Sequence, residues 1–233
     1  VLILGGSSDI GVSTARIFLR NNWKVSAHYY ETKKNFDEIK FYKNLDFFKF
    51  DCRNIYKLNS YISKNKSYFK SFDAFVNLTG YLKPSSLDNL KLKDLYDHIN
   101  VNYISGLLIT KVMLQGMKKR KWGRIVLSSS IGTKFGGGEK SFAYSLSKFI
   151  NEFFPSHYKK FYSDNITINT MQIGITDTKI HNKLKGKNMK QRIKKIPIKR
   201  MAKKDEVANY IFDLCKAKNN LITNTTINIS GGE

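Results

Sequence analysis

Several residue types are scarce in this chain, and each scarcity excludes a class of protein. Only two cysteines occur among the 233 residues, and Cys52 and Cys215 lie far apart with no Cys-x-x-Cys pair. Such usage argues against a disulfide scaffold and predicts reduced thiols in a cytoplasmic protein. The chain has no run of about 18 apolar residues, so no membrane-spanning helix is expected. The apolar start at residues 1–6 is too short for the core of a signal peptide and is typical of a buried strand.

Histidine and acidic residues are scarce as well. The four histidines show no spacing typical of a metal site, so no metal is expected; they are His28, His98, His157 and His181. Lysine and arginine number 41 against 18 aspartates and glutamates, a formal net charge of +23. This charge indicates either a polyanionic partner, such as nucleic acid, an anionic membrane or an acidic carrier protein, or a biased composition. Because basic residues are spread widely and are denser only between Lys179 and Lys204, the sequence favours biased composition.

Short apolar stretches alternate with longer helical patterns along the whole chain. We expect strands at residues 1–6, 24–30, 47–52, 72–80, 123–130, 166–174 and 225–232. We expect helices near residues 10–21, 54–66, 91–118, 144–163 and 204–217. This alternation predicts an α/β fold with a Rossmann-type, doubly wound parallel sheet. No repeat or linker divides the chain, so residues 1–233 are expected to form a single domain.

Small and polar residues gather where the expected strands end. In such sheets, ligands bind beyond the carboxyl ends of the strands. The first strand runs into "ILGGSSDIG" (residues 3–11), in which Gly5 permits a tight turn and Gly11 lets the next helix pack closely. Free N–H groups at the start of that helix would face a pyrophosphate, so the stretch predicts dinucleotide binding.

Tyr144 and Lys148 lie four residues apart in "SFAYSLSKFI" (residues 141–150). On a helix this spacing places both side chains on one face, one turn apart. A carbonyl that receives a hydride needs a nearby proton donor, and an adjacent ammonium would lower the pKa of a tyrosine. Taken alone, the spacing does not distinguish a proton-transfer pair from an ordinary amphipathic helix.

Together these motifs, in this order, resemble the short-chain dehydrogenase/reductase family, and within it the bacterial 3-oxoacyl-carrier-protein reductases. The resemblance covers essentially the whole chain and is carried by "LGGSSDIG" (4–11), "KFDC" (49–52), "VNLTG" (76–80), "INVNYISG" (99–106), "YSLSK" (144–148) and "QIGITDT" (172–178). The chain departs from the family pattern at Leu4, Asp9 and Ile173, which replace threonine, glycine and proline. Asp9 is expected to point away from the phosphates or to cap the helix, and Pro155 is expected to kink or break the helix that Tyr144 begins.

The resemblance implies the residues of the site. The catalytic set would be Tyr144 as general acid/base, Lys148, Ser129 to polarise the carbonyl, and Asn102 to position a water; a slip of one residue would select Ser130 instead. The residues expected to bind the cofactor are Gly5, Ser7, Ser8, Ile10, Gly11, Asp51, Cys52, Asn77, Gly80, Tyr144, Lys148, Gly174, Ile175 and Thr178. The positive charge, with Lys33 and Lys34 after the second strand, favours NADP(H) over NAD(H).

The expected activity is NAD(P)-dependent reduction of a ketone or oxidation of a secondary alcohol. A 3-oxoacyl thioester on a carrier protein is the first choice of substrate, and a nucleotide sugar or another polar ketone is the alternative. A non-catalytic dinucleotide- or nucleic-acid-binding protein is the third hypothesis, although no nucleic-acid-binding motif is visible. We expect a homo-oligomer, a dimer or tetramer, and a substrate-covering segment near 179–204. Its apolar residues Ile180, Leu184, Met189, Ile193 and Ile196 would line or close the pocket.

Overall fold

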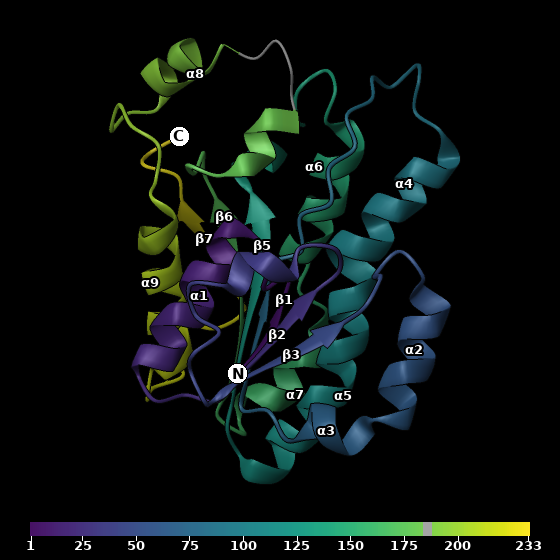
Figure 1. The fold of residues 1–233 in the computed structure, drawn as a ribbon, viewed down its shortest axis with the longest axis vertical. Helices are drawn as coiled ribbons and strands as arrows, with labels where there is room; N and C mark the ends of the chain where they lie inside the picture. The colour runs from purple at the N-terminus through teal and green to yellow at the C-terminus, as the bar shows by residue number, and fades with distance from the viewer. Residues whose placement is uncertain (184–187) are drawn as a thin grey trace.

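The computed structural model describes residues 1–183 and 188–233, without the side chains of residues 182 and 183 (Figure 1). Within these ranges seven parallel strands form one sheet in the order β3-β2-β1-β4-β5-β6-β7. The strands are β1 (Leu2–Leu4), β2 (Val25–Tyr29), β3 (Leu45–Lys49), β4 (Ala74–Asn77), β5 (Gly123–Ser130), β6 (Ile166–Ile173) and β7 (Thr226–Ile229). The predicted Rossmann-type α/β fold is confirmed.

Helices cover both faces of the sheet. They are α1 (Asp9–Arg20), α2 (Ile55–Lys64), α3 (Lys66–Lys70), α4 (Leu92–Ile99), α5 (Ser105–Arg120), α6 (Phe142–Phe149), α7 (Lys159–Tyr162), α8 (Met189–Lys195) and α9 (Lys204–Lys216). The helices α1 and α9 lie side by side against one face, and α2, α5 and α7 cover the other (Figure 1). The carboxyl ends of the strands point toward the edge where α8 lies.

The two hydrophobic cores follow from the alternation of side chains along buried strands. In β1, Ile3 joins the core beneath α1 and α9, whereas Leu2 and Leu4 join the core beneath α2, α3 and α5. All three side chains have no exposed surface. The strand is therefore apolar throughout, as its sequence predicts for a sheet covered on both faces.

Two of the expected long helices are interrupted. The helix expected at 91–118 contains a π-helical turn at Asn100–Ile104 between α4 and α5. The helix expected at 144–163 ends at Phe149, and a short 3-10 turn at Ile150–Glu152 leads to an extended Phe153. Pro155 has no N–H to donate to the preceding turn, so the predicted break is confirmed and α7 is a separate short helix.

The strand order reverses between β1 and β4. Both strands continue parallel, with Leu4 opposite Asn77, but the chain leaves them in opposite directions across the sheet. The loops after β1 and β4 therefore diverge and leave a cleft beyond their carboxyl ends. This switch point determines where the site lies.

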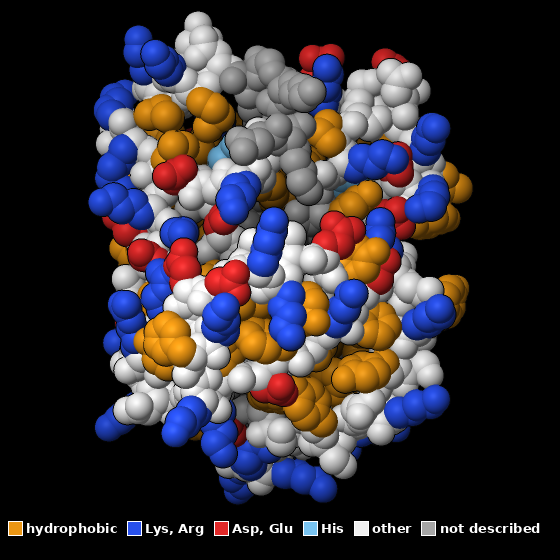
Figure 2. All heavy atoms as spheres, viewed as in Figure 1, with side chains coloured by type: hydrophobic (Ala, Val, Ile, Leu, Met, Phe, Trp, Pro, Cys, Tyr) orange, Lys and Arg blue, Asp and Glu red, His pale blue; other side chains and the backbone are white. Residues whose placement is uncertain are grey.

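Basic side chains are spread over the surface and do not form one stripe. Figure 2 shows lysine and arginine side chains over the whole visible face, interspersed with acidic and apolar ones. Several basic residues are paired, such as Arg16 with Glu38 and Arg200 with Glu206. On this face the distribution differs from the concentrated footprint that nucleic-acid binding requires.

Candidate active site

A cavity of about 750 Å³ occupies the switch point and extends across the carboxyl ends of the strands. The predicted site residues that line it are Gly5, Ser7, Ser8, Ile10, Asp51, Cys52, Gly80, Ser129, Tyr144, Lys148, Gly174, Ile175 and Thr178. Three other predicted residues, Gly11, Asn77 and Asn102, lie beside the cavity without lining it. The structure thus brings segments from the whole chain to one cleft.

The glycine turn has the geometry needed to receive a phosphate. Gly5 adopts a φ of +75°, and a Cβ there would lie 2.8 Å from the backbone of Leu78. A Cβ on Gly11 would lie 2.5 Å from the carbonyl oxygen of Gly5, so only glycine permits this approach of α1 to the turn. The Ser8 hydroxyl caps α1 by accepting a hydrogen bond from the Gly11 amide at 3.1 Å. These residues fit a dinucleotide pyrophosphate at the N-terminus of α1.

The tyrosine and lysine predicted from their spacing lie on α6 and face the cavity. Lys148 is almost fully buried, and its Nζ donates to the Ser128 hydroxyl at 2.7 Å and to the Thr79 carbonyl oxygen at 3.0 Å. Burial lowers the pKa of Lys148 to about 7. Because burial penalises the ammonium, this lysine exchanges protons near neutral pH.

Tyr144 is half-buried and lines the cavity, as does Ser130. Burial raises the pKa of Tyr144 to about 12, and the nearby Ser130 hydroxyl offsets only part of that effect. The expectation that the ammonium lowers the pKa of the tyrosine is therefore wrong for this structure. Burial disfavours the charged form of both groups, and the ammonium is bonded to Ser128 and Thr79 instead.

Ser129 and Ser130 both line the cavity, and the geometry of β5 favours Ser130, the predicted alternative. Successive side chains of a strand point to opposite faces, so Ser128 and Ser130 share one face and Ser129 takes the other. Ser129 donates its hydroxyl to the Glu152 carboxylate, which also accepts from Thr133 at 2.7 Å. Ser130, the alternative by a slip of one residue, is the serine that meets Tyr144.

Two predicted asparagines organise the loops behind the cavity. The Asn102 amide donates to the Tyr81 carbonyl oxygen at 3.0 Å and to the Ser147 hydroxyl at 2.9 Å, and its Oδ1 accepts from the Tyr81 amide. Asn77 Oδ1 accepts from the Thr79 hydroxyl at 2.8 Å, which fixes the residue whose carbonyl oxygen binds Lys148. Asn77 therefore supports the lysine through Thr79, whereas Asn102 joins Tyr81 to Ser147, and the expected catalytic water at Asn102 stays a prediction.

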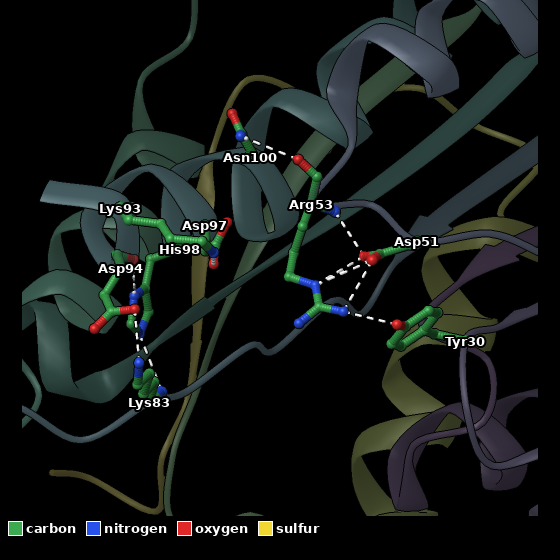
Figure 3. A network of polar contacts seen from close by, with 9 residues as sticks. All are labelled: Tyr30, Asp51, Arg53, Lys83, Lys93, Asp94, Asp97, His98 and Asn100. Atoms are coloured by element: carbon green, nitrogen blue, oxygen red, sulfur yellow. Dashed lines mark hydrogen bonds and ion pairs between the residues drawn. The ribbon is translucent and has the colours of Figure 1, made fainter. Parts of the chain in front are cut away.

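At the opposite end of the cleft, Asp51 is held by an arginine that the sequence analysis did not single out (Figure 3). Arg53 donates to both carboxylate oxygens of Asp51, at 3.0 and 2.9 Å, and to the Tyr30 hydroxyl at 2.7 Å. Its guanidinium also lies 5.0 Å from the centre of the Tyr30 ring. Burial alone would raise the pKa of Asp51, but the hydrogen bonds from Arg53 outweigh it and lower that pKa.

A buried histidine beneath the glycine turn was also missed. His28 Nδ1 accepts a hydrogen bond from the Gly5 amide at 3.2 Å, and Nε2 lies 2.9 Å from the Phe50 carbonyl oxygen. Burial lowers the pKa of His28 to about 4, so the imidazole is neutral at physiological pH. Cys52 packs 3.7 Å from the same imidazole, and burial raises the pKa of its thiol to about 12. Both cysteines are buried free thiols.

The loop after β6 crosses the mouth of the cavity. The 3-10 helix η6 (Lys179–Lys183) follows Thr178, whose hydroxyl donates to the Thr176 carbonyl oxygen at 3.2 Å. Of the apolar residues expected to close the pocket, Ile180 and Met189 line it. Ile193 and Ile196 do not, and Leu184 lies outside the described residues.

Residues 1–183 and 188–233 contain neither a candidate membrane-spanning helix nor a candidate metal site. No helix there has both the length and the apolar character that crossing a bilayer requires. In the same ranges no three histidine, cysteine, aspartate or glutamate side chains are grouped as metal ligands.

Comparison with known proteins extends these observations. Residues 5–233 match the family model described as Enoyl-(Acyl carrier protein) reductase. The 3-oxoacyl-[acyl-carrier-protein] reductase of Thermotoga maritima is 27% identical over 237 residues, which cover 99% of this chain and 96% of the relative. That of Buchnera aphidicola subsp. Acyrthosiphon pisum is 28% identical over 183 residues, 77% of this chain and 75% of the relative.

Solved structures agree with the sequence relatives. ElxO with NADP bound shares 28% identity and a TM-score of 0.84, over 99% of this chain and 96% of its own. A short-chain dehydrogenase/reductase from Serratia marcescens has the same fold, with a TM-score of 0.85 at 21% identity over 99% of this chain and 96% of its own. The chain is an NAD(P)-dependent oxidoreductase and belongs to the short-chain dehydrogenase/reductase family.

Proposed function

We propose that this enzyme reduces the 3-oxo group of an acyl thioester held on a carrier protein, with NADPH as reductant. The observation that carries the proposal is that Ser130, Tyr144 and the buried Lys148 line the same cavity. The curated relatives reported above are 3-oxoacyl-[acyl-carrier-protein] reductases, which supports this choice of substrate.

The proposed chemistry assigns one task to each side chain. When bound, the cofactor supplies a hydride to the carbonyl carbon. The Ser130 and Tyr144 hydroxyls donate hydrogen bonds to the carbonyl oxygen, where negative charge develops. Tyr144 then gives its proton to that oxygen, and Lys148, with a pKa of about 7, returns a proton to the phenolate near neutral pH.

The proposed cofactor contacts divide along the cleft. Ser7, Ser8 and Ile10 would meet the pyrophosphate, whereas Gly174, Ile175 and Thr178 would hold the nicotinamide end. For the 2′-phosphate of NADP(H), the supporting groups are the Ser7 and Thr32 hydroxyls, the Asn35 amide and Arg53, all of which line the cavity. Lys33 and Lys34 do not line it, so the basis for NADP(H) moves from those lysines to Arg53.

An acidic carrier protein is the proposed partner. The helix α8 borders the cavity through Met189 and Arg192, and its Lys190, Lys194 and Lys195 are exposed. Opposite charge on the carrier would steer it to this edge and make binding weaker at high salt. Part of the net charge of +23 would then serve to bind the acidic carrier beside the cavity.

A homo-oligomer is proposed from an exposed apolar row on α6 and the residues after it. Phe142, Leu146, Phe149 and Phe153 are all exposed, and the last two are more than half exposed. Such a row on a helix commonly marks a contact with another chain. Light scattering on the purified protein tests for a dimer or tetramer, and a cytoplasmic location stays a prediction from the free cysteines.

A substrate panel tests the proposed function. NADPH oxidation is measured with a 3-oxoacyl thioester on acidic carrier protein, the same thioester on a short pantetheine arm, and a polar ketone such as a keto sugar nucleotide. We expect the highest kcat/KM with the carrier-bound substrate, and an advantage over the short thioester that shrinks as salt rises. Preferential reduction of the keto sugar nucleotide would contradict the thioester proposal and support the polar-ketone alternative. Oxidation of neither NADPH nor NADH by any substrate would contradict both.

A further inference from the structure

Asp9 occupies the place where a phosphate-binding turn usually has no charge. It is the first residue of α1, directly after the capping Ser8, and it lines the cavity. A carboxylate is stabilised there by the positive end of the helix dipole. That same positive end is what a pyrophosphate would use, so the carboxylate and the phosphates compete for it.

The Asp9 side chain has a distant partner. Its Oδ2 accepts a hydrogen bond from the backbone amide of Lys179 at 2.8 Å. Lys179 begins η6, and a residue at the start of a helix has an amide with no acceptor within that helix. Asp9 therefore caps a helix that lies 170 residues further along the chain.

The next residue of η6 contacts the other side of the cleft. The Ile180 side chain packs over Gly80, where an added Cβ would lie 3.6 Å from Ile180 Cδ1. The segment thus lies between the turn after β1 and the end of β4, and both Lys179 and Ile180 line the cavity. The hydrogen bond from the Lys179 amide to Asp9 and the apolar contact between Ile180 and Gly80 connect the segment to both loops.

We infer that Asp9 is a positioning residue that joins the phosphate turn to η6. Its acceptor oxygen holds η6 across the cleft, and its negative charge lowers affinity for the anionic cofactor. This inference rests on dinucleotide binding in the cleft, as proposed above. The two effects belong to different properties of one side chain, so substitutions can separate them.

Asp9→Asn and Asp9→Ala separate the acceptor from the charge. Asparagine keeps an oxygen for the Lys179 amide but has no charge, so NADPH should bind about three- to tenfold more tightly at low salt. This gain should disappear at high salt, because salt screens charge but not the hydrogen bond. Alanine should bring the same gain in affinity, together with faster amide exchange in residues 176–183 and about a tenfold rise in the KM of the ketone.

Three measurements test the inference: NADPH titration at low and high salt, hydrogen exchange of the 176–183 peptide without cofactor, and steady-state kinetics. Asp177→Asn is the matched control, because it removes an exposed carboxylate from the same loop outside the cavity lining. Equal exchange in the Asn and Ala variants, or NADPH binding that is weaker in Asp9→Asn, would overturn the inference. Failure of the unsubstituted protein to bind either nicotinamide cofactor would instead count against the proposed function, and the exchange experiment would still test the contact with η6.

Discussion

The titratable groups at the two ends of the cleft have their pKa values shifted in opposite senses, toward the neutral forms at one end and toward the charged forms at the other. At the proposed reacting end, Lys148 is buried and Tyr144 is half-buried, and removal from solvent shifts both pKa values toward the neutral forms. At the other end, which we propose binds the adenosine of the cofactor and call the adenosine end, Asp51 and Arg53 are partly exposed and paired, and the pairing favours the charged forms. A side chain whose neutral form is favoured is suited to exchange a proton during a reaction. A side chain kept charged by an ion pair is suited to electrostatic interaction with a ligand. In the proposed function, proton transfer and cofactor recognition therefore occur at opposite ends of the cleft.

The largest expected effect is at the reacting end. Tyr144→Phe removes the proposed proton donor, so ketone reduction should fall by about 10²–10⁴-fold while the Kd of NADPH stays nearly unchanged. Steady-state kinetics and a fluorescence titration measure the two quantities. Tyr56→Phe, at an exposed tyrosine on α2, is the control. If the Tyr144→Phe protein keeps its turnover, Tyr144 is not the proton donor.

A matched pair of serine variants sharpens the assignment within the reacting end. Ser130→Ala removes a hydrogen-bond donor beside Tyr144 and should lower kcat by about 10²–10³-fold. Ser129→Ala removes the hydrogen bond to Glu152 and should change stability by about 1 kcal/mol with turnover nearly unchanged. Rate assays and urea unfolding distinguish the two variants. A large loss of kcat in Ser129→Ala, with turnover nearly unchanged in Ser130→Ala, would make Ser129 the serine that polarises the carbonyl.

This pair also shows what the sequence could and could not predict. The order of motifs was sufficient to predict the parallel sheet, the glycine turn and the position of Tyr144 and Lys148 at the cavity. The order of motifs was insufficient to choose among the three consecutive serines at 128–130, because the sheet face toward which each side chain points depends on the register of β5. One signal was available, since Ser128 and Ser130 continue the alternation of Val126, whereas Ser129 continues that of Leu127.

Other features of the site depend on tertiary contacts that no local pattern carries. Arg53 follows Asp51 by two residues, yet its role arises only because β2 ends beside β3 and presents Tyr30. The π-helical turn around Asn102 has no motif of its own. The direction of the Tyr144 pKa was mispredicted because it depends on burial, which spacing alone does not reveal.

The glycine turn at the binding end depends on a neutral imidazole, which predicts acid sensitivity. The pKa of His28 is about 4 in the folded protein and 6.5 ordinarily, so the unfolded chain takes up the proton first as pH falls. Stability therefore decreases from pH 6.5 to 4, by up to about 3 kcal/mol from this group.

His28→Gln should remove that part of the decrease, as measured by urea unfolding across the pH range. The exposed His157, replaced in the same way, is the control. An unchanged acid slope in His28→Gln would show that the imidazole is not the group responsible.

The smallest expected effect is on cofactor preference. Arg53→Ala removes the cation at the adenosine end, so the preference for NADPH over NADH, as a ratio of kcat/KM, should fall by about tenfold. Lys33→Ala should leave that ratio nearly unchanged, because Lys33 lies outside the cavity lining. If Lys33→Ala changed the ratio more than Arg53→Ala, recognition of the 2′-phosphate would have to be reassigned.

The separation of the two ends is tested most directly by measuring hydride transfer in a single turnover, and NADPH affinity, in both Tyr144→Phe and Arg53→Ala. We predict that Tyr144→Phe slows hydride transfer with Kd nearly unchanged, and that Arg53→Ala weakens NADPH binding with the transfer rate at saturation nearly unchanged. A Tyr144→Phe protein that loses affinity as much as Arg53→Ala, or an Arg53→Ala protein that slows transfer as much as Tyr144→Phe, would contradict this account.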